Sequence, residues 1–566
     1  MIRSMGIFRP LVSSPRLGSN VWSRVMRRTW SSGDDTSSDF YRYTSGRWLF
    51  EEEQQLEARH VRFNVDSLVA IAARCIGHEP ASCVKVEKLL EGDFNKCLLL
   101  TMEDGSQVVA RVPNPNAGRP HYTTASEVAT MDFARNKVGL PVPKVLAWSS
   151  RASENPVGAE YVIMEKAPGT PLSEVWPLIS DSEKSDIVRS FVNLDIKLLS
   201  HPLRGIGALY YPNDIPSTAQ IPALPPKDYD DRWVLGPTND QLFFLRGKGE
   251  LTLDRGPWNT TQEYLVAVCQ REMKAIQDTR RPLRPIGIVG PGGYQPDRAL
   301  KLSVCREFLK VVDHILPPAN CQIPVLWHPD LHLDNIFVNP EKPSEITGLI
   351  GWQSAKVGPL FNQVSYPTFL RRLENLRAIH LSPGSKDLQA EAQRKSNELL
   401  LEKTMYRCYD TYSVYPNSPV FDSLSYRDTL CGQIIILIDI ILYDGELAVQ
   451  GLLIELADTW GEHIENKGDF PRPLKYSATD IERHQELELR WTEGILLMND
   501  LLESLGGLDP GWEGWAKHED YGPLKERLAL VREQFVEYQA GGDKEAAKAW
   551  EAAWPFRGDY YQGPGN

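Results

Sequence analysis

The stretch VLWHPDLHLDNIFVNPEKPSEITGLIGWQ, residues 325–353, decides the fold that we expect for this chain. A short apolar run leads into the polar pattern His-x-Asp-Leu-His-x-x-Asn at 328–335. The residues that follow predict a short strand, a turn and a second strand. The second strand ends in Ile350-Gly351-Trp352-Gln353. A metal-dependent site of this build needs a carboxylate at that strand end, and the sequence has glycine there.

The length and composition predict a globular chain with more than one lobe. At 566 residues the chain is too long for one minimal core, so we expect two lobes with extensions, or two to three domains. Hydrophobic residues make up 42% and charged residues 24%, which is typical of folded proteins. The formal net charge of -13 argues against a nucleic-acid partner, because such binding needs clustered Lys and Arg.

The cysteines and the apolar runs exclude two further classes of protein. The eight cysteines are scattered without C-x-x-C or zinc spacing, so we expect reduced thiols and no structural metal. The most apolar run, 434–442, is interrupted by Asp439 and is far shorter than the roughly 20 residues that cross a bilayer. It predicts a buried core helix, and no transmembrane segment is expected elsewhere.

The first 33 residues differ in composition from the rest of the chain. They contain six arginines, several serines and no Asp or Glu, and they lack the continuous apolar stretch of a secretory signal. This composition predicts a mitochondrial transit peptide over residues 1–33 and localisation in the mitochondrial matrix. A disordered basic tail is the alternative.

The pattern after the transit peptide predicts an arm and then a small lobe of strands. Residues 34–82 form the predicted N-terminal arm, in which Val65, Leu68 and Ile71 have helical spacing. Residues 83–167 form the predicted first lobe. Its expected order is strands at 84–90, 97–102 and 107–112, a helix at 123–138, and strands at 145–148 and 161–165.

Helical patterns dominate the remainder of the chain. We expect a mostly helical second lobe over 168–540, with an irregular insert at about 212–295 and a tail at 541–566. The glycine-rich segment 287–293 is expected to be a loop, because no strand and helix frame it as a phosphate-binding motif requires. Helices are predicted at 385–404 and at 480–505. The fold class is therefore α+β, with a small antiparallel lobe and a large helical lobe.

Several of these segments resemble known families. The pattern at 328–335 resembles the catalytic loop of the aminoglycoside phosphotransferase and choline-kinase-like families, which are relatives of protein kinases. The segment Tyr43-Thr44-Ser45-Gly46-Arg47-Trp48, the block 346–360 and the transit peptide are similar to the fungal mitochondrial group named for altered inheritance of mitochondria. The resemblance spans roughly residues 40–540. It implies a bilobal protein-kinase-like fold that uses ATP and Mg²⁺.

The resemblance also implies roles for residues of the loop. Asp330 would be the carboxylate that faces the attacking hydroxyl of an acceptor. Asn335 would supply an oxygen to magnesium, and His328 and His332 would brace the loop. A polar turn between strands is the alternative for this segment.

In the first lobe, the resemblance points to nucleotide-binding positions. The turn 91–96, with Gly92 and Asn95, lies where a flexible turn would cover the phosphates, although one glycine makes a poor phosphate cradle. Arg111 takes the place of the usual phosphate-binding lysine, with a differently shaped cation, and Glu127 takes the place of its helix partner. A surface arginine is the alternative for Arg111. The hinge that would meet adenine begins at Met164 and Glu165.

The glycine at 351 leaves two functions open. Related families carry Asp at this position, and its loss would slow catalysis roughly a thousandfold if the carboxylate were worth about 4 kcal/mol. Asp334 is the acid nearest in sequence to the expected catalytic residues, and it could bind the metal ion in place of the missing carboxylate. One hypothesis is an ATP-dependent kinase with a small-molecule or protein acceptor. The other, which the glycine favours slightly, is an impaired or inactive kinase-fold protein that binds nucleotide or acts as a scaffold.

Overall fold

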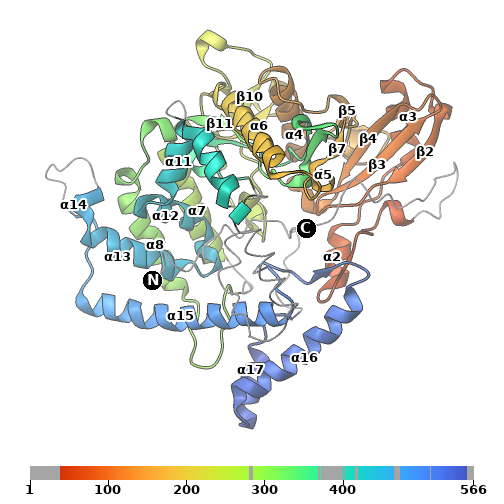
Figure 1. Cartoon of the computed structure of the whole chain (residues 1–566). Helices are drawn as coiled ribbons and strands as arrows, with labels where there is room; N and C mark the ends of the chain where they lie inside the picture. The colour runs from red at the N-terminus through yellow and green to blue at the C-terminus, as the bar shows by residue number, and fades with distance from the viewer. Residues whose placement is uncertain are drawn as a thin grey trace.

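The structure is a computed structural model that describes residues 38–278, 285–367, 370, 400–401, 403–414, 418–463, 472–509 and 511–557. The predicted transit peptide and most of the helix predicted at 385–404 lie outside these residues. Figure 1 shows the strands of one sheet on one side of the molecule and a large group of helices on the other. The predicted α+β fold, with a small antiparallel lobe and a large helical lobe, is confirmed.

The small lobe is built on a five-stranded antiparallel sheet with the order β2-β3-β4-β6-β5. On one face, Leu98 and Leu100 pack in a core with residues of helix α3, whereas Leu99 points to the opposite face and packs in a core with residues of α4. Both faces are therefore buried, which explains the nearly continuous apolar runs. The predicted order of three strands, a helix and two strands is confirmed. The elements are α3 (Val65–Cys75), β2 (Cys83–Lys88), β3 (Asn95–Met102), β4 (Gln107–Pro113), α4 (Tyr122–Asn136), β5 (Val145–Ser149) and β6 (Tyr161–Glu165).

A close backbone approach joins the two lobes after β6. Gly169 has φ +91°, and a Cβ at this position would lie 2.3 Å from the carbonyl oxygen of Val338. Only glycine fits this combination of conformation and space. The next residues form β7 (Thr170–Pro171), which pairs with β12 (Ile336–Asn339). The first residues of the large lobe are therefore fixed directly against the strand that follows the predicted catalytic loop.

The large lobe combines helices with short strands around the predicted loop. Strand β12 forms a hairpin with β13 (Lys342–Leu349), and β11 (Pro324–Leu326) pairs with β14 (Val357–Pro359), so the predicted strand, turn and strand are confirmed. The apolar run 434–442 is buried, as predicted, in α12 and the 3-10 helix η14 (Ile438–Tyr443). The helices are α5 (Leu172–Val175), α6 (Asp181–Leu199), α7 (Thr261–Asp278), α8 (Arg298–Val311), α9 (Leu360–Gln363), α11 (Pro419–Arg427), α12 (Leu430–Leu437), α13 (Glu446–Asp458), α14 (Trp460–His463) and α15 (Ala478–Ser504).

The insert at 212–295 is more regular than the sequence indicated. It contains β9 (Ile221–Pro222), β10 (Val234–Gly236) and the long helix α7, and β10 pairs with β8 (Ala208–Tyr210). The ring of Trp233 meets Phe133 of α4 edge to face at 5.3 Å, and its Nε1 donates to Asp132 at 3.1 Å. The insert therefore covers α4, a contact that proline-rich local sequence does not reveal. The segment 287–293 is a loop, as predicted.

The N-terminal arm pairs with a strand from the C-terminal part of the described chain. Strand β1 (Arg47–Trp48) of the arm pairs antiparallel with β15 (Trp515–Ala516). Downstream of β15, α16 (Tyr521–Ala540) and α17 (Lys544–Ala552) pack on each other, so the segment from 541 that was expected to be a tail contains a helix. Figure 1 shows this helical pair at the lower edge of the molecule, below α2 (Glu52–Ala58).

None of the described helices combines the length and the apolar character that a membrane-spanning segment needs.

A buried carboxyl in α6 gives a prediction about stability and pH. Asp195 is buried and accepts a hydrogen bond from the Tyr409 hydroxyl at 2.7 Å. Burial raises the pKa of Asp195 to about 7, although the Tyr409 hydrogen bond opposes this shift. Because the folded-state pKa lies above the unfolded one, stability is lost as the pH rises from the unfolded pKa through 7.

Asp195→Asn keeps an acceptor for Tyr409 without the charge. We expect it to gain on the order of 2 kcal/mol more stability, relative to wild type, at pH 8 than at pH 5. Urea denaturation at the two pH values measures this, and an equal effect at both would contradict it.

Candidate functional site

The predicted catalytic loop lies between β11 and β12 and is braced by His328. This imidazole is buried, with Nε2 2.8 Å from the carbonyl oxygen of Ile350, while Nδ1 accepts the backbone N–H of Asp330 at 3.1 Å. The two bonds together require a neutral ring with its proton on Nε2. Burial lowers the pKa of His328 to about 3. His328 therefore ties the loop to the residue before Gly351 through a neutral ring.

Asp330 and Asn335 are oriented by a direct contact within the loop. The side chain of Asp330 is 53% exposed, so its carboxylate is open to an acceptor. Asn335 Nδ2 donates to the backbone carbonyl of Asp330 at 2.9 Å. Since the amide nitrogen is used in this way, the side-chain oxygen of Asn335 is left as an acceptor. The loop thus presents one carboxylate and one amide oxygen, the two groups that the sequence indicated.

His332 lies between two acids on the loop. Its Nε2 is 3.7 Å from Asp330 Oδ2, and its Nδ1 is 3.5 Å from Asp334 Oδ2 and accepts the Asp334 backbone N–H. Asp334 is buried in the 3-10 turn η12 (Leu333–Asn335), which packs against α5 and β7. None of these contacts brings the Asp334 carboxylate to the position of Gly351. Its role as a displaced metal ligand stays a hypothesis.

Gly351 has no room for a side chain in this conformation. Its φ is +84°, and a Cβ built on it would lie 2.6 Å from Asn335 Nδ2 and 3.1 Å from Asn335 Oδ1. The amide of Asn335 thus occupies the space that a side chain at 351 would need. The packing around residue 351 therefore suits glycine and leaves no space for a carboxylate side chain unless Asn335 moves.

The side chains at these positions do not form a magnesium site by themselves. The described part of the chain contains no group of three or more His, Cys, Asp or Glu that could hold a metal ion. Asn335 offers one oxygen and Gly351 offers none, whereas Mg²⁺ in phosphate sites is bound through one or two carboxylates as well as phosphates and water. The donor set fits a complete magnesium site poorly.

In the small lobe, Arg111 and Glu127 form a buried ion pair. Arg111 Nη2 on β4 lies 2.5 Å from Glu127 Oε2 on α4, and both side chains are at least nine-tenths buried. Burial lowers the pKa of Arg111, but the Glu127 carboxylate and its hydrogen bond more than offset this and raise it, so the guanidinium stays charged. The alternative of a surface arginine is wrong. Arg111 Nε and Glu127 Oε1 are buried without a hydrogen-bond partner, so each retains capacity for a further polar contact.

The turn expected to cover the phosphates is tied to the segment after Gly351. Asn95 Nδ2 donates to Gln353 Oε1 at 2.7 Å, and Gln353 Nε2 donates to the carbonyl of Ala117 at 2.8 Å. A Cβ at Gly92 would meet nothing within 4 Å, so the backbone of the turn is open there. Gln353 was not among the predicted site residues, because nothing in the local sequence indicates a contact with residues more than 200 positions away.

The predicted hinge follows the end of β6. Met164 is buried and pairs across the sheet with Val109 and Val145. Glu165 Oε2 accepts the backbone N–H of Lys144 at 3.0 Å and lies 3.3 Å from Arg135 Nη1. The Glu165 side chain therefore supports the connection between α4 and β5, and the Glu165 backbone N–H donates to the carbonyl of Lys144 at 2.9 Å.

Comparisons with curated proteins give two groups of relatives. No protein-family model matches the sequence. The chain is 34% identical over 316 residues to a subtelomeric hrmA-associated cluster protein of Aspergillus fumigatus, a match that covers 51% of the chain and 60% of that protein. It is 23% identical over 592 residues to altered inheritance of mitochondria protein 9, mitochondrial, of Candida albicans, covering 93% of the chain and 92% of that protein. The first match thus spans less than two thirds of the relative.

Solved structures with a related fold include phosphotransferases. A Ralstonia eutropha protein assigned as an aminoglycoside phosphotransferase matches with a TM-score of 0.36 and 17% identity over 69% of this chain and 96% of that one. The ADP-bound aminoglycoside phosphotransferase APH(2'')-Ib matches with a TM-score of 0.33 and 15% identity over 68% and 95%. Because these TM-scores lie below 0.5, the fold is described from the strand order and the helix placement of this chain. The predicted similarity to the altered inheritance of mitochondria group is confirmed.

Proposed function

We propose that this chain is a mitochondrial kinase-fold protein that binds ATP and transfers its terminal phosphoryl group slowly to a hydroxyl acceptor. The observation that carries the proposal is the contact between Asn335 and Asp330. It orients the loop so that an exposed carboxylate and an amide oxygen are offered from one rigid turn. A turn that served only to connect two strands would not need a buried histidine to brace it.

Different residues of the chain would have different roles in the proposed phosphoryl transfer. Asp330 would accept the proton of the acceptor hydroxyl, and His328 would hold the loop in place. Arg111, kept charged by Glu127, would contact phosphate oxygens through its unpartnered Nε. ATP supplies the phosphoryl group when it is bound. A small molecule or a protein would serve as the acceptor, and the matrix would be the compartment if residues 1–33 direct import.

A second candidate function is favoured by the packing at Gly351. Asn335 fills the space of the missing side chain, and Gln353 joins the phosphate-covering turn to the segment after Gly351. Both features fit a protein that binds nucleotide without turning it over and acts as a scaffold. The two candidates share the nucleotide site and differ in the chemistry at Asp330.

Thermal shift with ATP, with and without magnesium, together with ATP turnover, tests the proposal. We expect ATP to stabilise the wild type and Asp330→Asn alike, because the Asp330 side chain is half exposed and its contact with His332 is long, at 3.7 Å. Turnover is expected to be low in the wild type and at least about a hundredfold lower in Asp330→Asn. Glu341→Gln removes an exposed charge from the β12–β13 turn and serves as the matched control.

The outcomes separate the two candidates. Absence of stabilisation by ATP, with or without magnesium, would contradict nucleotide binding and therefore both candidates. Stabilisation without turnover in the wild type would favour the scaffold. Turnover that is equal in wild type and Asp330→Asn would show that another group, or a contaminant, does the chemistry.

A further inference from the structure

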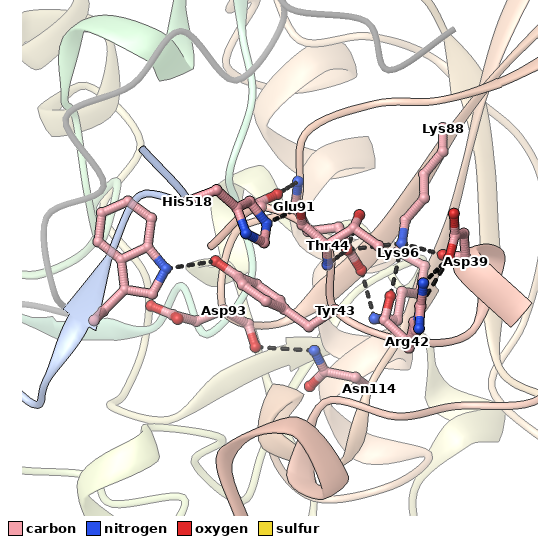
Figure 2. A network of polar contacts seen from close by, with 12 residues as sticks. Asp39, Arg42, Tyr43, Thr44, Lys88, Glu91, Asp93, Lys96, Asn114 and His518 are labelled. Carbon is pink, nitrogen blue, oxygen red and sulfur yellow. Dashed lines mark hydrogen bonds and ion pairs between the residues drawn. The ribbon is translucent and has the colours of Figure 1, made fainter. Parts of the chain in front are cut away.

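The carboxylate of Glu91, at the start of the turn 91–96, is held by the N-terminal arm. Glu91 is 2% exposed. Its Oε2 accepts the backbone N–H of Thr44 at 2.8 Å and the Thr44 hydroxyl at 3.1 Å. In the other direction, the backbone N–H of Glu91 donates to Ser45 Oγ at 2.7 Å. Figure 2 shows Thr44 and Glu91 together at the centre of this network.

Two buried ammonium groups complete the surroundings of this carboxylate. Lys88 Nζ lies 2.7 Å from Glu91 Oε2 and also donates to the carbonyl of Arg42 in the arm at 2.7 Å. Lys96, from the far end of the turn, pairs with Glu91 Oε1. Hydrogen bonds between charged groups in a buried setting are strong and directional. The arm is therefore bound to Glu91 directly and through Lys88, and Lys96 joins the far end of the turn to the same carboxylate.

The next acid of the turn is also fixed. Asp93 Oδ1 lies 3.0 Å from Arg59 Nη2, both side chains being buried, and Arg59 belongs to the segment that ends α2. Asn114 Nδ2 donates to the carbonyl of Asp93 at 2.9 Å. Both acids of the turn are thus held by partners outside it.

The arm is in turn held by the C-terminal segment 512–518. In addition to the β1–β15 pairing, Trp515 Nε1 donates to the Tyr43 hydroxyl at 3.1 Å, and His518 Nε2 lies 3.1 Å from the carbonyl of Thr44. The fit is tight, since a Cβ at Gly46 would lie 2.4 Å from Trp515 Nε1 and 2.7 Å from the carbonyl oxygen of Ala516. Thr44 therefore contacts the C-terminal segment on one side and Glu91 on the other.

We propose that Glu91 is a positioning residue, through which the C-terminal segment 512–518 and the arm set the position of the turn over the nucleotide. This inference rests on the proposed function, because the turn covers phosphates only if ATP binds at the proposed nucleotide site. The path is continuous: the C-terminal segment holds Thr44, Thr44 holds Glu91, and the same turn reaches Gln353 through Asn95. Displacement of the C-terminal segment would release the turn.

Gly46→Ala tests the chain of contacts from the C-terminal segment through Thr44 to Glu91, and it leaves the residues of the turn unchanged. The added methyl collides with Trp515 and with the backbone of β15, and so separates the C-terminal segment from the arm. Gly522→Ala is the matched control, because it adds a methyl in the first turn of α16 where nothing lies within 4 Å. Trp515→Phe is a second variant, which removes the bond to Tyr43 and keeps an aromatic ring.

Hydrogen exchange of a peptide spanning 89–97, measured without nucleotide, is the first readout. We expect exchange to be about fivefold faster or more in Gly46→Ala and Trp515→Phe, and unchanged in Gly522→Ala. Faster exchange confined to the arm and to 512–518 would overturn the proposal. Because this readout needs no ligand, it does not depend on the proposed function.

ATP affinity, measured for the same proteins, is the second readout. We expect it to fall several-fold in Gly46→Ala and Trp515→Phe and to be retained in Gly522→Ala, because a released turn loses its preorganised contact with phosphates. Equal affinity in all four proteins, despite faster exchange, would overturn the positioning role. If none of them, wild type included, binds ATP, then the proposed function fails and the positioning role fails with it. The exchange data would still show whether the turn is coupled to the C-terminal segment.

Discussion

Replacement of Arg111 by alanine is expected to lower the free energy of unfolding by about 3–5 kcal/mol. The substitution leaves the Glu127 carboxylate buried and without the cation that pairs with it, since Glu127 is 2% exposed and forms its ion pair with Arg111. An uncompensated charge inside a protein costs far more than the pair itself contributes. Urea denaturation, or the midpoint of thermal unfolding where refolding fails, measures the loss.

Two further variants make this prediction specific. Arg111→Met combined with Glu127→Met removes both charges and keeps the volume, so we expect most of the stability to return. Arg119→Ala removes an exposed arginine that stacks on the Tyr122 ring at 4.0 Å, and we expect it to cost about 1 kcal/mol or less. A loss in Arg111→Ala no larger than in Arg119→Ala would mean that Glu127 finds another partner or protonates without cost.

The pair also connects stability with the proposed nucleotide site. Arg111→Lys keeps the cation but replaces a planar fork by a shorter point charge. We expect it to fall between wild type and Arg111→Ala in stability, because an ammonium can still neutralise Glu127. If this variant loses more free energy of ATP binding than free energy of unfolding, Arg111 contacts the phosphates directly.

Gly351→Asp is expected to lower stability by about 1–3 kcal/mol and to leave ATP turnover low. The backbone at 351 is in the left-handed region, and the new Cβ would lie 2.6 Å from Asn335 Nδ2. The variant therefore has to displace the amide that orients the loop through the carbonyl of Asp330. A carboxylate introduced at 351 would therefore disturb the Asn335 contact.

Gly351→Ala is the matched control, because it carries the same Cβ and the same backbone strain without a carboxylate. We expect both variants to unfold at lower temperature than the wild type, and magnesium to increase the ATP-dependent stabilisation of neither. A magnesium-dependent gain in Gly351→Asp alone, with turnover several hundredfold above that of Gly351→Ala, would contradict this. It would show that Asn335 moves aside easily and that glycine is the whole reason for slow catalysis.

The sequence alone was sufficient where the information is local. The strands and the helix of the small lobe follow from alternation and helical spacing within short windows, and the structure has them in the predicted order. The loop 328–335 could be recognised because all its polar residues lie within eight positions of one another. Gly351 stood out for the same reason, since it lies just after β13, the second strand that follows this loop.

Tertiary structure decided how those parts are held. Three hydrogen bonds join residues that are between 47 and 472 positions apart. They connect Asn95 with Gln353, Thr44 with Glu91, and Trp515 with Tyr43. Hydrogen bonds of this kind cannot be predicted from sequence periodicity, because each depends on the relative position of two separate elements in the folded chain. The insert was likewise expected to be irregular, and only its packing on α4 shows what it covers.

The sequence by itself thus determined the fold class and the position of the candidate loop 328–335, because both are encoded by neighbouring residues. Only the folded chain decided that Gly351 is packed against Asn335, and that the arm contacts both the C-terminal segment 512–518 and the turn beside the proposed nucleotide site. These features arise from contacts between segments that the chain brings together when it folds, and a residue's own neighbours in sequence do not specify them.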